Sequence, residues 1–482
     1  MSQTRASMLV LLLAAVLGCT VGPNYQRPDM AVPQQWVHAD QPGLSAGVVA
    51  VLQWWQTLQD PRLDALIERA VHTNLDLRMA AARVREARAL RGVAAADQFP
   101  TVTVSSAYAR TRRSANVPTP AFEGDLFQSG FDASWELDLF GRVRRTVEAA
   151  SADLAASEDN RRDVLVTLLA EVARNYVDVR GFQRRLDITR DNIRTQQQTV
   201  ELTEVRFAAG LSSELDVAQA RANLATTESQ VPVLTSSLTQ AMHRLSVLLG
   251  QPPGALLGEL ARVQPIPLGP ASVPIGLPSD LLRRRPDVRR AEQELAAATA
   301  RIGVATADLF PRFSLLGTLD LQSSDLGSLF SAGSRAWGFG PRFLWPVFDA
   351  GRIRANIAVQ TARQETTLAR YEQAVLVALE DVENALVAFA QERLRHRALA
   401  EAVAANRRAV ELSMEVYTRG LGDFLSVLES QRSLFGSEDQ LVQSERAVVA
   451  NLITVYKALG GGWEGWTPIA RAAPRTVAAA GS

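Results

Sequence analysis

The sequence predicts an α+β chain that is mostly helical and contains two tandem copies of one unit, each with two β-strands and one very long helical hairpin. Residues 207–224 (FAAGLSSELDVAQARANL) align with residues 417–434 (YTRGLGDFLSVLESQRSL) at an offset of 210, which places Gly210 on Gly420. Two further landmarks recur at nearly the same offset: residues 76–100 with 287–311, and residues 135–144 with 345–354. Because three landmarks recur in one order at one spacing, we infer an internal duplication.

The first residues have the features of an export signal. Arg5 gives a short positive region, and residues 8–17 form an apolar run that is too short to span a bilayer. The run V-L-G-C that follows resembles a bacterial lipobox, which makes Cys19 the predicted lipid acceptor; the alternative is a buried structural thiol. Cys19 is the only cysteine, so no disulfide can form within the chain. The next residue is Thr20 rather than an aspartate, which favours export onward to the outer membrane.

Composition and motifs argue against an enzyme and against a nucleic-acid-binding protein. Lys+Arg and Asp+Glu both number 51, so no net charge attracts an acidic partner. Residues 43–47 (GLSAG) match the G-x-S-x-G nucleophile pattern, but they lie in a loop where we expect no strand, and the pattern requires one. Residues 281–290 (LLRRRPDVRR) are interpreted as a solvated helix start with local ion pairs. The four histidines lack metal-ligand spacing, so we predict no catalytic residue, metal or cofactor.

Strands are predicted where the hydrophobic period changes to two. Asp60 and Pro61 open a first helix, a second runs from about residue 75 to 97, and alternation follows. In residues 131–139 the odd positions are apolar and the even positions are polar or acidic. A soluble sheet would turn the acidic face to water, whereas an outer-membrane barrel would turn it to a lumen and the apolar face to lipid. Composition leaves both open, but a strand of about ten residues and the export signal favour the barrel.

Two long hairpins account for most of the helix. No proline occurs from residue 142 to 207, and a helix of that length spans roughly 100 Å. Apolar residues recur every seven positions on each long helix, which drives a left-handed supercoil; on this one they are Leu186, Ile193, Val200 and Phe207. Pro232 is expected to kink the returning helix. In the second turn, Gly420 and Gly422 are expected to break the helix, and Asp423 to cap the next one.

These patterns define the expected division of the chain. The segments are a signal peptide (1–18), a lipidated arm (19–60), repeat 1 (61–250, with strands about 100–110 and 127–140 and a hairpin 141–250), a Pro/Gly-rich crossover (251–279), repeat 2 (280–459, with strands about 311–322 and 337–349 and a hairpin 351–459) and a C-terminal tail (460–482).

Four strands in one chain cannot close a barrel. Open sheet edges leave backbone groups unpaired in lipid, and the smallest single-chain barrels have about eight strands. Three chains would supply twelve strands and a ring of long helices below them. The sequence therefore predicts a homotrimer, with a twelve-stranded outer-membrane β-barrel continued by a periplasmic α-helical coiled-coil barrel.

Several motifs together resemble one protein family. They are CTVGPNYQRP, WWQTLQDPRLDALI, NLDL, LLRRRPDVRRAE, Y-x-x-G-x-x-x-x-L-x-V and the terminal ALGGGW. The chain resembles the outer-membrane factor family, the TolC- and OprM-like exit ducts of tripartite efflux systems, in its NodT-type lipoprotein branch. The resemblance covers residues 19–466. It implies a lipid-anchored trimer in the outer membrane that passes drugs or other small molecules from an RND-type inner-membrane pump and a periplasmic adaptor to the outside.

The resemblance also implies a periplasmic gate. In that family the tunnel closes just beyond the second hairpin turn, where the pattern is L-x-x-L-D-A-Q-R; residues 425–432 read LSVLESQR. Leu425 and Glu429 therefore match the gate leucine and aspartate, with Arg432 one turn further on the same helix face. Three copies would form an apolar constriction above an acidic ring. The alternative is an ordinary exposed pair of Glu429 with Arg432, which is worth little.

Further residues are implied in contacts at the turns and between the hairpins. Gly210 and Gly420 match the turns, and Asp216 and Tyr417 match positions that link the hairpins in relatives. The arginine of one such link is replaced by Gly422, which removes that link or moves it to Arg419.

Two other functions remain open from the sequence. A periplasmic coiled-coil scaffold lipoprotein would have the same helices, with its alternating segments in a soluble sheet. An exit duct for one-step (type I) protein secretion would share the tube and differ in what passes through it.

Overall fold

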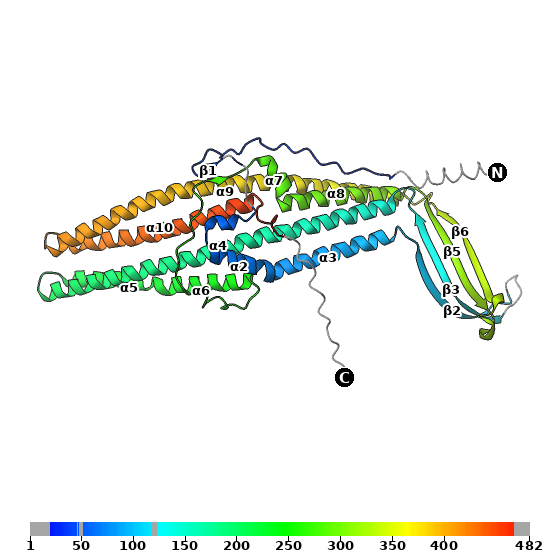
Figure 1. Cartoon of the computed structure of the whole chain (residues 1–482), viewed down its shortest axis with the longest axis horizontal. Helices are drawn as coiled ribbons and strands as arrows, with labels where there is room; N and C mark the ends of the chain where they lie inside the picture. The colour runs from blue at the N-terminus through cyan, green and yellow to red at the C-terminus, as the bar shows by residue number, and fades with distance from the viewer. Residues whose placement is uncertain (1–19, 46, 48–51, 117–122, 467–482) are drawn as a thin grey trace. The chain divides into compact units, whose positions relative to one another are not determined.

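The computed structural model describes residues 20–45, 47, 52–116 and 123–466 (Figure 1). The chain divides into two compact units, and each unit combines segments of both sequence copies. Unit 1 contains Met1–Met30, Ala81–Asp159 and Arg289–Ala374; unit 2 contains Ala31–Ala80, Asn160–Val288 and Val375–Ser482. The two copies are therefore not two separate globules.

The described residues form these elements. The helices are α2 (Pro61–Thr73), α3 (Leu75–Ala96), α4 (Arg142–Ala208), α5 (Glu214–Glu228), α6 (Gln230–Leu248), α7 (Pro278–Arg284), α8 (Pro286–Ala307), α9 (Arg352–Thr418) and α10 (Phe424–Ala458), with short 3₁₀ turns η1 (Trp54–Leu58), η2 (Leu326–Ser328) and η3 (Ala332–Ser334). The strands are β1 (Leu44–Ser45), β2 (Thr101–Arg112), β3 (Glu123–Leu137), β4 (Val273–Pro274), β5 (Arg312–Ser323) and β6 (Arg335–Leu344).

Unit 1 contains a four-stranded antiparallel sheet in the order β2-β3-β5-β6, as the alternating patterns predict. Phe131 lies opposite Val104 on one side and Leu319 on the other, so these three side chains share a face. The same face carries exposed large apolar side chains along all four strands; they include Val102, Tyr108, Trp135, Leu315, Trp337, Phe339 and Phe343. Asp132 lies opposite Thr103 and Thr318 on the other face. One face of the sheet is therefore apolar and the other polar.

The junction from sheet to long helix is built twice. The Trp135 indole donates to the Gln98 carbonyl at 3.0 Å, and in the second copy the Trp345 indole donates to the Leu309 carbonyl at the same distance. Asp138 accepts from the amide of Arg144 at 2.8 Å and so caps α4. In the second copy Asp349 accepts from the amide of Ile353 and caps α9. The duplication seen in the sequence is thus repeated in the hydrogen bonds.

The long hairpins also follow the predicted pattern. Helices α4 and α9 each contain 67 residues. The returning helix of the first hairpin is interrupted at Ser229, between α5 and α6. Pro232 explains this position, because it has no amide proton for the carbonyl of Glu228, four residues earlier. The predicted apolar stripe is only partly buried: Leu186 is 4% exposed, whereas Phe207 is 46% exposed.

Two expectations from the sequence are wrong. Residues 44 and 45 of the GLSAG motif do form a strand, the two-residue β1, which pairs in parallel with β4. Local alternation cannot reveal it, because the pairing is made by the Pro/Gly-rich crossover: the amide of Val273 donates to the carbonyl of Gly43. The basic cluster is not solvated throughout either, since Arg285 is 9% exposed. Its guanidinium donates to Asp287 and Asp381 and to the backbone carbonyls of Ala378 in α9 and Ala458 at the end of α10.

Among the residues described, no helix combines the length and apolar character needed to cross a membrane.

Candidate functional site

A small apolar cluster, here called the tip cluster, joins the two hairpins near their turns. It consists of Ala220 from α5, Tyr417 from α9 and Phe424, Val427 and Leu428 from α10. None of the five is more than 4% exposed, and the ring centroids of Tyr417 and Phe424 lie 5.6 Å apart. Because residues of both copies share this cluster, it fixes the first hairpin against the second within unit 2.

The first turn is held by its own residues. Gly210, like Gly420 in the second turn, has a φ of 73°, a left-handed conformation that favours glycine. Ser213 and Asp216 form a capping box, in which each side chain accepts from the backbone amide of the other. Partial burial alone would raise the pKa of Asp216, but hydrogen bonds from Ser213 and Ser212 outweigh it and lower the pKa. In the single chain, Asp216 therefore holds its own turn rather than linking the hairpins.

The second turn leads into the helix that carries the predicted gate. Asp423 accepts from the amide of Ser426 at 2.9 Å and from its hydroxyl at 2.7 Å, which confirms the expected N-cap. These side-chain and backbone hydrogen bonds lower the pKa of Asp423. Gly422 serves the turn differently from Gly420, because its backbone is not left-handed. A Cβ at Gly422 would lie 2.8 Å from Cγ1 of Val416, so space rather than conformation requires glycine there.

The predicted gate residues lie on the solvent side of α10. Leu425 is 49% exposed, and Glu429 is also exposed. On the opposite side of the same helix, Val427, Leu428 and Gln431 are buried against the first hairpin. An apolar and an acidic side chain are thus presented together, one helical turn apart, by a segment whose other side is packed.

Arg432 does not pair with Glu429. Its Nε donates to Oδ1 of Asn223 in α5 at 3.0 Å, so it serves as a contact between the hairpins. Within the described part of the chain, Glu429 forms no hydrogen bond or ion pair. The alternative of an ordinary Glu429–Arg432 pair is therefore wrong for the single chain, and the Glu429 carboxylate is available to another molecule.

The arginine that contacts Tyr417 was missed by reasoning from the sequence. Arg419, directly after α9, forms an exposed ion pair with Glu415 in the last turn of that helix at 2.5 Å. Arg206 instead places its guanidinium carbon 4.6 Å from the ring centroid of Tyr417 and donates to the carbonyl of Thr418. A signal was present, because position 206 aligns with Val416 in the second copy. A difference between the copies beside the turn marks a contact that only one copy supplies.

The arm after the predicted lipid acceptor is fixed to the start of α4. Cys19 itself lies outside the described residues, whereas Thr20 lies against Gly141: a Cβ on Gly141 would be 2.9 Å from Cα of Thr20. The Arg145 side chain, 3% exposed, donates to the carbonyls of Val21 and Gly22 and to Asn24. Within unit 1, the residue after Cys19 is therefore held where β3 ends and α4 begins.

Comparison with known proteins agrees with these features. The chain matches the outer membrane efflux protein family over residues 66–251 and 277–461. It is 34% identical over 464 residues to the solvent efflux pump outer membrane protein SrpC of Pseudomonas putida, covering 95% of this chain and 98% of that protein. It is 32% identical over 455 residues to nodulation protein T of Rhizobium leguminosarum bv. trifolii, covering 94% and 96%. Among solved structures, the outer-membrane channel OprN superposes with a TM-score of 0.88 at 39% identity, covering 92% of this chain and all of that one.

The chain combines an internal duplication, a sheet with one apolar and one polar face, and two long hairpins. The family match covers most of its length. Together these features define a channel protein rather than an enzyme. The chain belongs to the outer membrane efflux protein family. It is an outer-membrane efflux channel.

Proposed function

We propose that three copies of this chain form the exit duct of a tripartite efflux system. The duct passively passes small molecules from an inner-membrane pump and a periplasmic adaptor to the outside of the cell. The observation that carries this proposal is the sheet of unit 1, with its apolar face and its two unpaired edges, in a chain of this family.

The sheet edges support the trimer. Strands β2 and β6 are the ends of the sheet order, so each has one edge without a partner among the residues that the structure describes. They contain 12 and 10 residues. Unpaired strand edges of that length are unfavourable in lipid, because their backbone groups lack hydrogen-bond partners unless another strand pairs with them. Three four-stranded sheets joined edge to edge give a closed barrel, with the apolar face towards lipid and the face of Asp132 towards the lumen.

The arm supports lipid anchoring at Cys19. Because Thr20 is held at the end of β3, an acyl chain on the preceding residue would enter the membrane beside the strand ends. Two or more acyl chains give stable anchoring, so the lipid would hold each chain at the outer membrane before and after assembly.

The face of α10 supports a gate near the periplasmic tip. Leu425 and Glu429 are exposed while the opposite side of the helix is packed, so in a trimer the same pair from three chains would converge. Leucines would close the passage against water, and three carboxylates would repel one another and favour cations. Leu425, Glu429 and the contact formed by Arg432 together form the proposed gate.

The relatives indicate the class of cargo. SrpC is named for solvent efflux, and we infer that this chain likewise exports small organic molecules for an RND-type pump. The duct has no chemistry of its own, so the pump and the adaptor select what passes.

The proposal is tested by planar-bilayer conductance of the purified protein, with and without Leu425→Ser combined with Glu429→Ala. We expect small, mostly closed currents from the native protein and frequent large openings from the double variant. The matched control is Leu215→Ser with Gln219→Ala, the positions that align with 425 and 429 in the first copy. It should leave the currents closed.

Two results would overturn the proposal. A folded trimer that gives no current in any variant would favour the periplasmic scaffold. A native mass measurement showing only monomer in mild detergent would exclude the shared barrel.

A further inference from the structure

The long helix α4 presents a buried polar stripe to its neighbours within unit 2. Thr189, Gln196 and Thr203 are 1%, 4% and 0% exposed and lie seven residues apart. They are better buried than Phe207 of the predicted apolar stripe. Gln196 is the first of three consecutive glutamines, and its two neighbours Gln197 and Gln198 are exposed. One glutamine of three thus points into the protein, at a position where a long helix normally places an apolar side chain.

Polar contacts join α4 and α5 to α10 along this stripe. Arg185 pairs with Asp439, with 2.6 Å between Nε and Oδ1. Closer to the tip, the side-chain amide of Gln431 donates to the hydroxyl of Thr199 at 2.9 Å. Between these contacts, Nδ2 of Asn192 donates to the Glu438 carboxylate of α10 at 3.3 Å.

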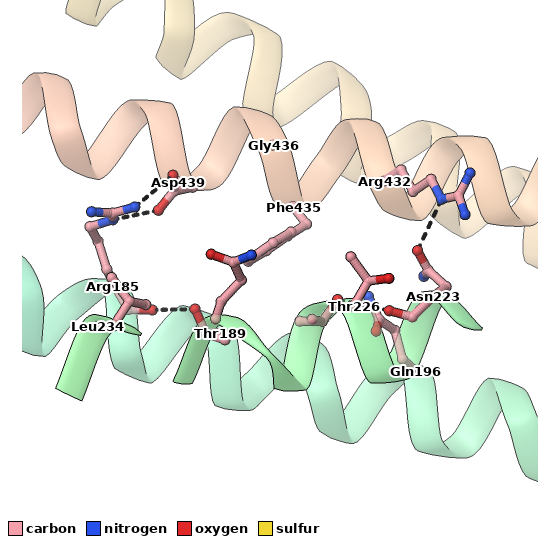
Figure 2. Close-up of a pocket in the computed structure, with 12 residues that line it drawn as sticks. Arg185, Thr189, Gln196, Asn223, Thr226, Leu234, Arg432, Phe435, Gly436 and Asp439 are labelled. Atoms are coloured by element: carbon pink, nitrogen blue, oxygen red, sulfur yellow. Dashed lines mark hydrogen bonds and ion pairs between the residues drawn. The ribbon is translucent and has the colours of Figure 1, made fainter. Parts of the chain in front are cut away.

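A cavity of about 290 Å³ lies among α4, α5, α6 and α10 at this level and is open to solvent where Thr226 and Gln230 are exposed (Figure 2). Its lining includes Thr189, Gln196, Thr226, Gln230, Phe435 and Asp439. Two features of the backbone border it. The interruption at Ser229 directly precedes Gln230, and a Cβ built on Gly436 would meet no atom within 4 Å.

The walls of the cavity offer acceptors for hydrogen bonds. The hydroxyls of Thr189, Thr226 and Thr227 each donate to a carbonyl four residues earlier in their own helix. Their oxygen lone pairs are then left for another donor. Gln196 Oε1 is buried and has no partner among the described residues. A buried amide oxygen without a hydrogen bond is rare in native proteins, so this oxygen favours a donor from outside the described residues.

The charges of the cavity argue against a cation, and its unpartnered oxygen argues against an anion. The Arg185 guanidinium is engaged by both oxygens of Asp439, and Arg432 reaches Asn223 through its Nε. A cation would meet these two arginines, and an anion would meet the acceptor oxygens of the threonines and Gln196. A small neutral molecule with several donors satisfies both limits. One water molecule occupies about 30 Å³ in the liquid, so the cavity has room for several.

We propose that this cavity is a site for ordered water, and that water bound to Gln196 bridges the two hairpins beside the tip cluster. Water-mediated hydrogen bonds can break and re-form without exposing apolar surface to water. They therefore join the hairpins while leaving them free to separate. The functional part of this inference rests on the proposed gate: the water site sets how readily the second hairpin moves away from the first and opens the tip.

Density for the waters tests the site directly. We would determine the structure of the full-length native protein by cryo-electron microscopy, at a resolution that shows water. We expect ordered density within hydrogen-bond distance of Gln196 Oε1. A cavity filled by rearranged side chains, or an empty cavity in a map that shows water elsewhere in unit 2, would overturn the proposal.

Matched variants test its consequence. Gln196→Met keeps the volume but removes the polar group, and it should displace the waters and lower the frequency of channel openings several-fold. Gln198→Met makes the same change at an exposed position and should alter neither. If Gln196→Met fails to assemble, Thr226→Val removes one hydroxyl of the wall and should reduce the water density and the openings in the same direction.

The outcomes separate this inference from the proposed function. Currents that respond to the 425/429 variant but are equal for Gln196→Met and Gln198→Met would contradict the water bridge and leave the gate in place. Absence of current in every variant would contradict the duct, while the density around Gln196 would still decide whether the water site exists.

Discussion

Arg206 lies against the face of Tyr417, with its guanidinium carbon 4.6 Å from the ring centroid, and joins the end of α4 to the end of α9. Its Nη1 also donates to the Thr418 carbonyl at 3.4 Å. A guanidinium over an aromatic ring is worth about 0.5–1 kcal/mol at an exposed site and more where water is excluded. The contact is thus strong enough to bias the tip and weak enough to be broken.

Arg206→Ala should therefore loosen the closed tip. We expect more frequent openings in planar bilayers, fewer than for the 425/429 variant, because the tip cluster remains. The control is Arg221→Ala, which removes an exposed ion pair with Glu204 in the same hairpin, a pair worth little. Equal currents from both variants would contradict the role of the Arg206–Tyr417 contact.

Gly130→Ala should disrupt the sheet. A Cβ at this position would lie 2.0 Å from Oδ1 of Asp320 and 2.5 Å from the Leu319 carbonyl oxygen on β5. Because one of these atoms belongs to the backbone, the strands would have to separate, at a cost of about 1–3 kcal/mol or more in each chain. Loss of the oligomer expected for the native protein on gel electrophoresis would show that the strands have separated.

Gly317→Ala is the matched control in the same sheet, because its nearest atom, Cβ of Ala133, would lie 3.9 Å away. An equally stable oligomer for both variants would mean that the close packing of Asp320 over Gly130 does not constrain the sheet.

The duplication, the four strands and the two hairpins were predictable because each leaves a local signal. Alternation marked β3, and Asp423 preceded an apolar run, so the sequence alone located them. The burial of Gln196 left no such signal, and the contact of Arg206 with Tyr417 left only a difference between the two copies, Arg206 in one and Val416 in the other. A polar side chain at a buried position looks the same in sequence as one in water, and only the register between hairpins distinguishes them.

The Arg285 cluster shows the same limit. Within LLRRRPDVRR nothing marks Arg285 as the buried arginine, yet its partners Asp287, Asp381 and the Ala458 carbonyl come from three helices, α8, α9 and α10. Arg285→Ala would leave two carboxylates without their cation. We expect a loss of about 3–5 kcal/mol in the free energy of unfolding, measured by denaturant unfolding. Arg283→Ala, at an exposed position of the same cluster, should change it little.

The acid sensitivity of this cluster gives a last prediction. Burial alone would raise the pKa of Asp287, but hydrogen bonding and charge from Arg285 outweigh it, so the pKa lies below its ordinary value. A carboxylate with a lowered pKa in the folded state contributes stability above the unfolded pKa of about 3.9 and loses it as the pH falls through the folded value. The native protein should therefore be more stable than Asp287→Asn at pH 7, and the difference should shrink only below about pH 4. Thermal unfolding of both proteins from pH 7 to pH 3 measures it. A difference that vanished already between pH 7 and 5 would show that another group controls this contact.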